Sequence, residues 1–320
     1  MNLQIFAGFK THTKNHFLTL GALISTILMW ASAFIGIRVG MQEYHAGSFS
    51  LLRLGFGAIC MLIIYKIKPP KNPLAKKDML SAALLGVIGM GIYHFFLNLG
   101  ELTVSAGIAS FIIAQSPVFT ILLSVIFLQE KISKFRWFGL FVSICGVFLI
   151  AAGEAQNAQF DIGVIYILIS TFAISVYVTQ AKQLLTRMSC LYSTVFVVLG
   201  GAASSLIFLP QLVHDLPRAS AAATWSAIYL GVFPTAIACL TFNYALSRLS
   251  RVTASSWMYA MPLVASLMGW LMLGELPSSF AFIGGMVALS GTVLANTTFY
   301  LRAPSLFSSL LASLKELRQK

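Results

Sequence analysis

Apolar runs of about 18 residues or more recur along the whole of this 320-residue chain, and only short polar segments separate them. A helix of that length crosses the hydrocarbon core of a membrane and satisfies its own backbone hydrogen bonds there. Charged residues make up 9% of the chain and hydrophobic residues 58%, which argues strongly against a water-soluble fold. The sequence therefore predicts an all-α polytopic membrane protein.

The runs predict ten transmembrane helices with short connections. The expected helices cover residues 18–37, 48–66, 79–99, 104–128, 136–153, 162–182, 192–213, 224–246, 252–274 and 280–300. The chain then divides into an amino-terminal segment (1–17), a first unit of five helices (18–153), a second unit of five helices (162–300) and a carboxyl-terminal tail (301–320).

Basic residues predict the orientation. Counted on alternate sides from a cytoplasmic amino terminus, eighteen Lys and Arg residues fall in the cytoplasm, and only Arg38 and Arg218 fall outside. Such an excess is typical of cytoplasmic loops, so both termini are expected in the cytoplasm. The tail combines cations with a leucine face, which predicts an amphipathic helix on the inner leaflet. That face consists of Leu306, Leu310, Leu314 and Leu317.

The chain contains an internal repeat. Shifted by 145 residues, residues 81–100 align with residues 226–245 without a gap, and the register holds for three helices. Helices 1 and 6 align more loosely, at a shift of 142 residues. Five helices per unit is an odd number, so the second unit must be inverted in the membrane, an arrangement that permits alternating access. The paired residues include Asn98 with Asn243, Pro117 with Pro262, Glu130 with Glu275, Gly139 with Gly284, and Gly146 with Gly291.

Pro117 and Pro262 occupy equivalent positions in long apolar runs. A proline in a helix interior bends the axis, and a membrane tolerates this where neighbouring helices or a polar cavity satisfy the freed carbonyl. A static kink that only shapes packing is one interpretation. The recurrence favours the other interpretation, in which both prolines belong to gating helices.

Residues 18–300 resemble the EamA-type transporters of the drug/metabolite transporter superfamily. The resemblance is carried by "MWASAFIGIRVG" in helix 1, by "LLRLGFGA" in helix 2, and by a proline, glutamate and glycine pattern in each unit. That pattern consists of Pro117, Glu130 and Gly139, then Pro262, Glu275 and Gly284. The resemblance implies ten helices and a central cavity walled chiefly by helices 1, 3, 4, 6, 8 and 9.

The resemblance also implies a secondary transporter in the inner membrane. Its solute is expected to be a small neutral or zwitterionic metabolite such as an amino acid, moved by alternating access in an exporter, facilitator or exchanger. An uptake carrier for a cationic or zwitterionic metabolite such as S-adenosylmethionine is the alternative, and a non-transporting receptor or a channel is a further one. No Asp or Glu lies in the middle of a predicted span, so the sequence lends little support to coupling through a carboxylate.

Two polar residues near the prolines are candidates for substrate contact. Gln115 precedes Pro117 by two residues and Tyr259 precedes Pro262 by three, where a broken helix exposes polar backbone. His94 shares a helix face with Asn98 and either lines a cavity or forms an interhelical hydrogen bond. It is also the one internal candidate for carrying a proton.

Asn98 and its counterpart Asn243 are either a symmetric pair near the substrate or two structural clamps. The aromatic residues Trp30, Tyr177 and Trp257 either line the cavity or pack against neighbouring helices. In helix 6, tyrosine stands where tryptophan is commoner in the family that the chain resembles. Arg53 lies close to the outer end of helix 2, so anchoring to headgroups is favoured over solute binding.

Chemistry other than transport has little support. The spans assemble no nucleophile with a base and no paired acids, so an enzyme is not expected. No phosphate-binding GxxxxGK[ST] loop, cofactor site or metal cluster is predicted. The expected partners are a small-molecule solute and the lipid bilayer, without nucleic acid or an obligate protein partner. The cysteines Cys60, Cys145, Cys190 and Cys239 are interpreted as packing residues.

Overall fold

The computed structural model describes residues 2–70, 72–128, 132–154, 161–249, 254, 257–275 and 278–302, and all regular structure in these ranges is helical. The first part of the chain forms α1 (Asn2–Gly40), α2 (Ala46–Ile67), α3 (Lys76–Gly86), η1 (Val87–Ile92), α4 (Tyr93–Gly100), α5 (Ala106–Ile113), α6 (Ser116–Leu128) and α7 (Lys134–Glu154). The second part forms α8 (Ile162–Leu184), α9 (Cys190–Ser205), η2 (Leu206–Phe208), α10 (Leu209–Asp215), α11 (Ala221–Leu230), η3 (Gly231–Ile237), α12 (Ala238–Arg248), η4 (Trp257–Ala260), α14 (Met261–Leu273) and α15 (Ser279–Arg302). Glu130 and most of the predicted tail, residues 303–320, lie outside the described residues.

Seven segments among the described residues are long and apolar enough to cross a membrane. They are Phe17–Gly40, Ala46–Ile67, Lys76–Gly100, Ala106–Phe127, Ile162–Leu184, Cys190–Asp215 and Ala221–Arg248. Two shorter apolar helices, Trp257–Leu273 and Ser279–Ala295, follow them. The predicted class, an all-α polytopic membrane protein, is thereby confirmed.

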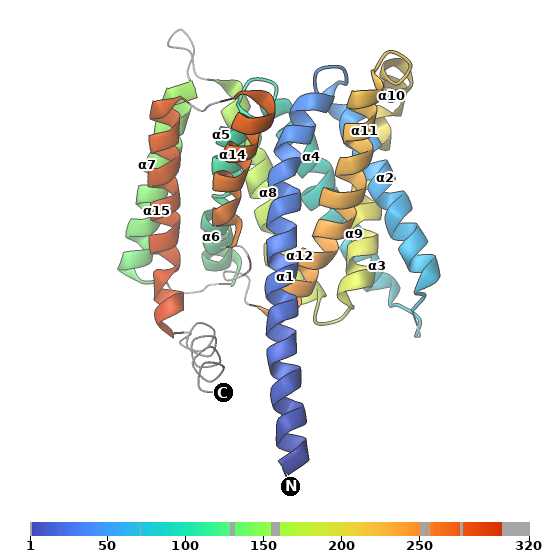
Figure 1. Cartoon of the computed structure of the whole chain (residues 1–320), viewed down its shortest axis with the longest axis vertical. Coiled ribbons are helices and arrows are strands. Elements are labelled where there is room, and N and C mark those ends of the chain that lie inside the picture. Colours follow the sequence, from blue (N-terminus) through green and yellow to red (C-terminus); the bar gives the residue numbers. More distant parts are fainter. Residues whose placement is uncertain are drawn as a thin grey trace.

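The helices form a bundle in which α1 passes beside α12 and projects beyond the other helices at its amino-terminal end (Figure 1). We call the end of the bundle at which α1 finishes the Arg38 face. The opposite end, at which α2 finishes, is the Lys68 face. The first helix begins at Asn2, sixteen residues before the predicted start, because residues 2–17 continue the same helix.

Two of the predicted helices contain a π-helical turn. η1 lies between α3 and α4, and η3 lies between α11 and α12. The two turns occupy positions that the 145-residue shift makes equivalent, since Ile92 and Ile237 end them. Turns of this kind are rare and are frequently found at functional sites.

The prolines begin helical segments and do not bend helix interiors. α5 ends at Ile113 and α6 begins at Ser116, so Pro117 is the second residue of α6. Pro262 is likewise the second residue of α14, which follows the 3-10 turn η4. Proline is tolerated in a first turn because its missing N–H has no helical partner there. Both long apolar runs are therefore discontinuous helices.

α7 and α15 lie side by side at one edge of the bundle (Figure 1). Their interface includes glycine and alanine at the closest points of contact, so the two backbones approach closely. A Cβ atom added to Gly146 would lie 2.2 Å from the backbone nitrogen of Ala288, and one added to Gly139 would lie 2.4 Å from that of Ala295. Glycine is required at both positions.

Two further close approaches repeat the same geometry. A Cβ atom on Gly231 would lie 2.4 Å from the carbonyl oxygen of Arg53, where η3 meets α2. A Cβ atom on Gly86 would lie 1.9 Å from the carbonyl oxygen of Val197, where α3 meets α9. The glycines are 145 residues apart and the residues that they contact are 144 apart. Arg53 and Val197 are thus equivalent in backbone position.

Candidate functional site

A cavity lies in the interior of the bundle. Its empty volume is about 500 Å³, including the open space at its mouth. Both π-helical turns contribute to its wall, which is mostly apolar and carries a few polar groups, as expected for a small-molecule site. The lining residues are Trp30, Ala33, Phe34, Ile37, Arg53, Met90, Tyr93, His94, Leu97, Ile174, Pro234, Thr235, Cys239, Met258 and Met261.

Trp30 forms part of this wall, as one of its two predicted roles requires. Its indole Nε1 donates a hydrogen bond to the carbonyl oxygen of Pro234, 3.0 Å away in η3. Its ring lies 5.0 Å from that of Phe242, centroid to centroid. The hydrogen bond and the ring contact hold the indole in one orientation, so the cavity presents a preformed aromatic surface.

Trp30, Met258 and Met261 also line a second, smaller hollow. That hollow lies between α1, α12 and the start of α14, and its wall includes Leu23 and Trp257. Leu23 precedes Trp30 by two helical turns, so the second hollow lies on the Lys68 side of the cavity. Trp257, a predicted cavity residue, borders this hollow and not the central one.

Arg53 is the charged residue in the cavity wall, and only 2% of its surface is exposed. Its Nε donates to Thr235 Oγ1 at 2.9 Å, which connects α2 to η3. Its Nη1 is buried and has no hydrogen-bond partner among the described residues. Arg53 begins the third turn of α2, about 10 Å along the helix axis from Ala46. The expectation that it extends to the headgroups is therefore wrong.

His94 and Tyr93 contribute the other large polar side chains. His94 Nδ1 lies 2.7 Å from the carbonyl oxygen of Met90. A carbonyl oxygen only accepts, so Nδ1 carries the proton of this hydrogen bond. The rings of Tyr93 and His94 meet edge to face at 4.7 Å. The predicted cavity position of His94 agrees with this placement, and it also makes a hydrogen bond within its own helix.

Gln115 and Tyr259 lie elsewhere. Gln115 is 1% exposed, and its Nε2 donates to the carbonyl oxygen of Phe111 at 3.0 Å. Its Oε1 accepts hydrogen bonds from Ser143 in α7 and from Thr292 in α15. Tyr259 Oη donates to the carbonyl oxygen of Thr292 at 3.4 Å. Both residues thus connect the discontinuous helices to the α7 and α15 pair, outside the cavity lining.

Asn98 and Asn243 form equivalent interhelical hydrogen bonds. Asn98 Nδ2 donates to Ser50 Oγ in α2 at 2.9 Å, and Asn243 Nδ2 donates to Thr194 Oγ1 in α9 at 2.9 Å. Asn243 Oδ1 accepts from Tyr177 Oη at 2.7 Å. All three predicted residues are buried away from the cavity lining, and the geometry fits the clamp interpretation.

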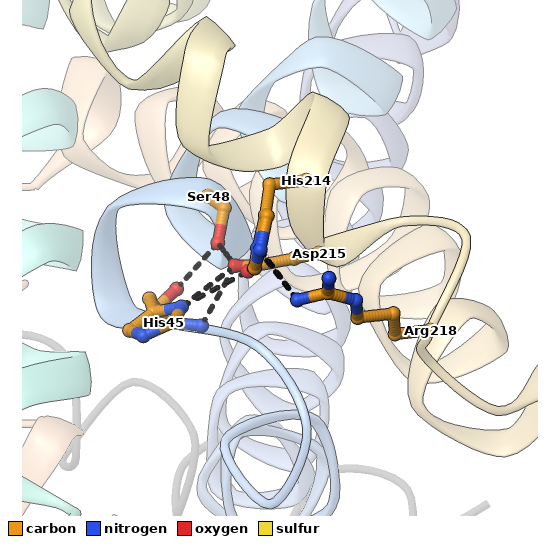
Figure 2. A network of polar contacts seen from close by, with 5 residues as sticks. All are labelled: His45, Ser48, His214, Asp215 and Arg218. Carbon is orange, nitrogen blue, oxygen red and sulfur yellow. Dashed lines mark hydrogen bonds and ion pairs between the residues drawn. The ribbon is translucent and has the colours of Figure 1, made fainter.

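The Arg38 face is closed by contacts between the two parts of the chain. Arg38 forms an ion pair with Glu275 at 2.7 Å, and Glu275 also accepts from the backbone nitrogen of Ala106 at the start of α5. Figure 2 shows a second contact, in which Asp215 at the end of α10 meets His45 and Ser48 at the start of α2. These contacts join the two parts of the chain on the side away from the second hollow.

Glu101 follows α4 on this face and is completely buried. Neither of its carboxylate oxygens has a hydrogen-bond partner among the described residues. Burial raises the pKa of Glu101 well above its usual value, and the charges of Arg38 and Arg53 offset this only in part. No role was predicted for this group from the sequence, because Glu101 lies at a helix end and not in the middle of a predicted span. Its only signal was the shared face with His94 and Asn98.

Arg38 has a counterpart in the second part of the chain. Its Nη1 donates to the carbonyl oxygen of Glu101 at 2.7 Å, beside the end of α4. Lys182 Nζ donates to the carbonyl oxygen of Leu246 at 2.5 Å, at the end of α12. Lys182 lies 144 residues after Arg38, and Leu246 lies 145 residues after Glu101. Glu101 therefore stands where the second part has a buried leucine.

Comparisons with known proteins identify relatives of this chain. The EamA-like transporter family matches residues 18–152 and, separately, residues 161–297. A protein of Streptantibioticus cattleyicolor named "probable terminal-alkyne amino-acid exporter" is 35% identical over 275 residues, which cover 86% of this chain and 92% of that protein. The uncharacterized transporter YdfC of Bacillus subtilis is 34% identical over 276 residues, 85% of this chain and 90% of its own length.

More distant similarities agree with these. The uncharacterized inner membrane transporter YedA of Escherichia coli K12 is 25% identical over 291 residues, covering 88% of this chain and 91% of YedA. A crystal structure of a protein with 17% sequence identity superposes with a TM-score of 0.62, over 88% of this chain and 96% of that one. At this identity the superposition shows a shared fold alone.

Proposed function

This chain belongs to the EamA-like transporter family, and from that premise we propose that it is a secondary transporter that moves a small neutral or zwitterionic metabolite across the inner membrane by alternating access. The name of the Streptantibioticus relative favours an amino-acid-like solute and export. The name of YedA favours the inner membrane as the location.

One observation carries the proposal most directly. The cavity lies between the two segments that the family matches, and each segment supplies part of the wall. Trp30, Arg53 and His94 come from the first segment, and Thr235 and Met261 come from the second. A site shared between two halves can open to either side when the halves move relative to one another.

We further propose that the two segments are inverted five-helix repeats, which makes ten helices in all. Four pairs of features support this. They are the two π-helical turns, the two prolines that begin α6 and α14, the close approaches at Gly86 and Gly231, and the hydrogen bonds of Arg38 and Lys182. Each pair recurs at a shift of 144 or 145 residues.

The conformation described above corresponds in this proposal to one closed to the outside. The excess of Lys and Arg supports a cytoplasmic Lys68 face and cytoplasmic termini. The Arg38 face, which ion pairs and hydrogen bonds close, then faces outward. The discontinuous helices that begin at Pro117 and Pro262 remain our candidates for gating, with the second hollow beside α14 as the inward path.

Counterflow in proteoliposomes tests the proposal. The purified chain is screened with labelled amino acids and related metabolites, and a carrier is expected to give saturable uptake that the same solute inside the vesicle accelerates. Trp30→Ala should reduce this flux by up to about tenfold, because an aromatic contact with the solute is lost from the cavity wall. Trp225→Ala is the matched control, since Trp225 is 67% exposed on the outside of the bundle and should leave flux unchanged.

Flux that stays linear with solute concentration and shows no acceleration from the far side would instead indicate a channel. If none of the solutes in the screen shows saturable uptake, the result would count against transport. Labelling of an introduced cysteine at position 72 from the cytoplasmic side tests the orientation, and labelling from the outside would reverse it.

A further inference from the structure

Arg53 is a buried cation in the cavity wall, and part of its guanidinium has no hydrogen-bond partner among the described residues. It is 2% exposed, lines the cavity and, among the described residues, uses only Nε in a hydrogen bond, to Thr235. Its Nη1 is buried without a partner, and none of the ion pairs among the described residues includes it. A buried, unpaired guanidinium costs several kcal/mol, so an arginine at such a position requires a compensating contact.

The internal repeat shows that packing does not require this arginine. Val197 holds the equivalent position, with its backbone against Gly86 as that of Arg53 lies against Gly231. Val197 is completely buried. A valine therefore satisfies the same helix contact in the second part of the chain, and the guanidinium of Arg53 must be explained by what it faces in the cavity.

We infer that Arg53 holds the carboxylate of the transported solute. A guanidinium presents parallel N–H donors that match the two oxygens of a carboxylate, and such charge-assisted pairs are strong where water is excluded. Thr235 fixes the orientation of the guanidinium through Nε, and Nη1 has no hydrogen-bond partner among the described residues. Glu101 forms no hydrogen bond with Arg53, because neither of its carboxylate oxygens has a hydrogen-bond partner among the described residues, and it lies outside the cavity lining.

The rest of the wall indicates what accompanies the carboxylate. The same wall includes the apolar residues Trp30, Phe34, Met258 and Met261, and Arg53 is the one charged residue among those that line it. A solute with one carboxylate and an apolar body, such as an apolar α-amino acid, fits this distribution. This inference rests on the proposed transport function and specifies the recognition chemistry of the same cavity.

Matched probes test the inference in the full-length protein. L-leucine, L-methionine and L-phenylalanine are each compared with their carboxamides, which keep the apolar body and lose the carboxylate charge. Wild-type protein in proteoliposomes is expected to exchange at least one acid, and to exchange its amide at least about tenfold more slowly. The same acid should raise the apparent melting temperature of the wild type in detergent, and the amide should not.

Variants locate the effect. Arg53→Met should reduce exchange of the acid by about tenfold to a hundredfold, the range for a hydrogen bond to a charged group. Arg53→Lys should retain part of the activity, since it keeps the charge without the planar fork. Arg187→Met is the matched control, because the Arg187 side chain is 52% exposed on the Lys68 face. If Arg53→Met does not fold, Thr235→Val and the wild-type probe series still test the assignment.

The outcomes separate this inference from the proposed function. The carboxylate site would be overturned if the wild-type protein exchanged acid and amide at equal rates. It would also be overturned if the Arg53→Met variant exchanged the acid as fast as the wild type. Neither result would argue against transport. If the wild-type protein neither exchanges any of the three acids nor is stabilised by one, the carboxylate site also fails. The proposed function is then judged by the broader solute screen.

Discussion

Two buried ionisable residues distinguish the first part of the chain from the second at the scale of single residues. Arg53 stands where the second part has Val197, and Glu101 stands where it has Leu246. Both aliphatic counterparts are completely buried, so apolar side chains suffice for the helix packing at these positions. The two ionisable groups are therefore features of the first part of the chain, and each predicts a measurable property.

Glu101 predicts a dependence of stability on pH. Burial raises its pKa above the ordinary value of 4.5, as does the charge of Glu275, while Arg38 and Arg53 lower it. The folded protein then binds a proton that the unfolded chain releases, so stability is complete below about pH 4.5 and falls as pH rises through the folded pKa. We expect the apparent melting temperature in detergent to fall over that window.

Glu101→Gln keeps the shape of the side chain without a titrating group, and should abolish this fall. Glu43→Gln serves as the control, because Glu43 is exposed and its pKa is lowered by a hydrogen bond from the Ser220 backbone. The Glu43→Gln variant should still show the fall in melting temperature as pH rises. A melting temperature of the wild type that is flat or rising above pH 5 would contradict the buried, protonated state of Glu101.

At the scale of elements, backbone contact between helices depends on glycine at a few positions. The α7 and α15 pair excludes even a methyl group at Gly146, because Ala288 lies 2.2 Å from the Cβ position. The discontinuities around Pro117 and Pro262 depend on this pair as well, since Gln115 and Tyr259 bind Thr292 in α15. The α7 and α15 pair is therefore joined by hydrogen bonds to the segments that precede Pro117 and Pro262.

Gly146→Ala should destabilise the protein by about 1–3 kcal/mol, because the two helices must separate to admit the new atom. Gly55→Ala is the matched control, since nothing lies within 4 Å of its Cβ position. In a helix interior it is expected to be neutral or to stabilise by about 0.5–1 kcal/mol. Thermal or denaturant unfolding in detergent measures both variants. Equal effects would mean that the interface accommodates the added methyl group.

At the scale of the whole molecule, the bundle is closed at the Arg38 face by contacts between the parts of the chain that the family matches separately. The ion pair of Arg38 with Glu275 joins the end of α1 to the segment after α14. The Asp215 contacts join α10 to α2 (Figure 2). For this face to open, the ion pair and the Asp215 contacts must break together. On the side of the Lys68 face, the cavity and the second hollow already have lining residues in common.

Glu275→Gln should shift the population toward a state open at the Arg38 face. The two side chains are partly exposed, so the pair is worth about 1 kcal/mol and the shift is about fivefold. The measurement uses a background without the four native cysteines and the substitution Ala33→Cys in the cavity wall. An impermeant thiol reagent applied at the Arg38 face should label Glu275→Gln faster, and the rate from the Lys68 face should not rise. Unchanged labelling from both faces would remove the ion pair from the gating scheme.

Sequence reasoning reached the class of protein, the positions of the apolar helices and two residues of the cavity, Trp30 and His94. It favoured Gln115 over Arg53 for solute contact, because it ranked residues by distance along the chain from a proline or from a helix end. The structure places Arg53 in the cavity wall and Gln115 in a network with α7 and α15. The repeat could have identified Arg53, since the shift of 145 residues that pairs Gly86 with Gly231 sets Arg53 against Val198, and a shift of 144 sets it against Val197, so its counterpart is a valine in either register.

The sequence by itself determined the properties that depend on neighbours along the chain. Hydrophobicity over about 18 residues is enough to specify a membrane helix, and the alternation of basic loops and the 145-residue register are read directly from the residues. Only the tertiary structure decided which side chains meet. The rotation of each helix about its axis, the break before Pro117 and the burial of Glu101 depend on contacts between residues far apart in the chain. Such contacts arise when the helices pack, and no local pattern encodes them.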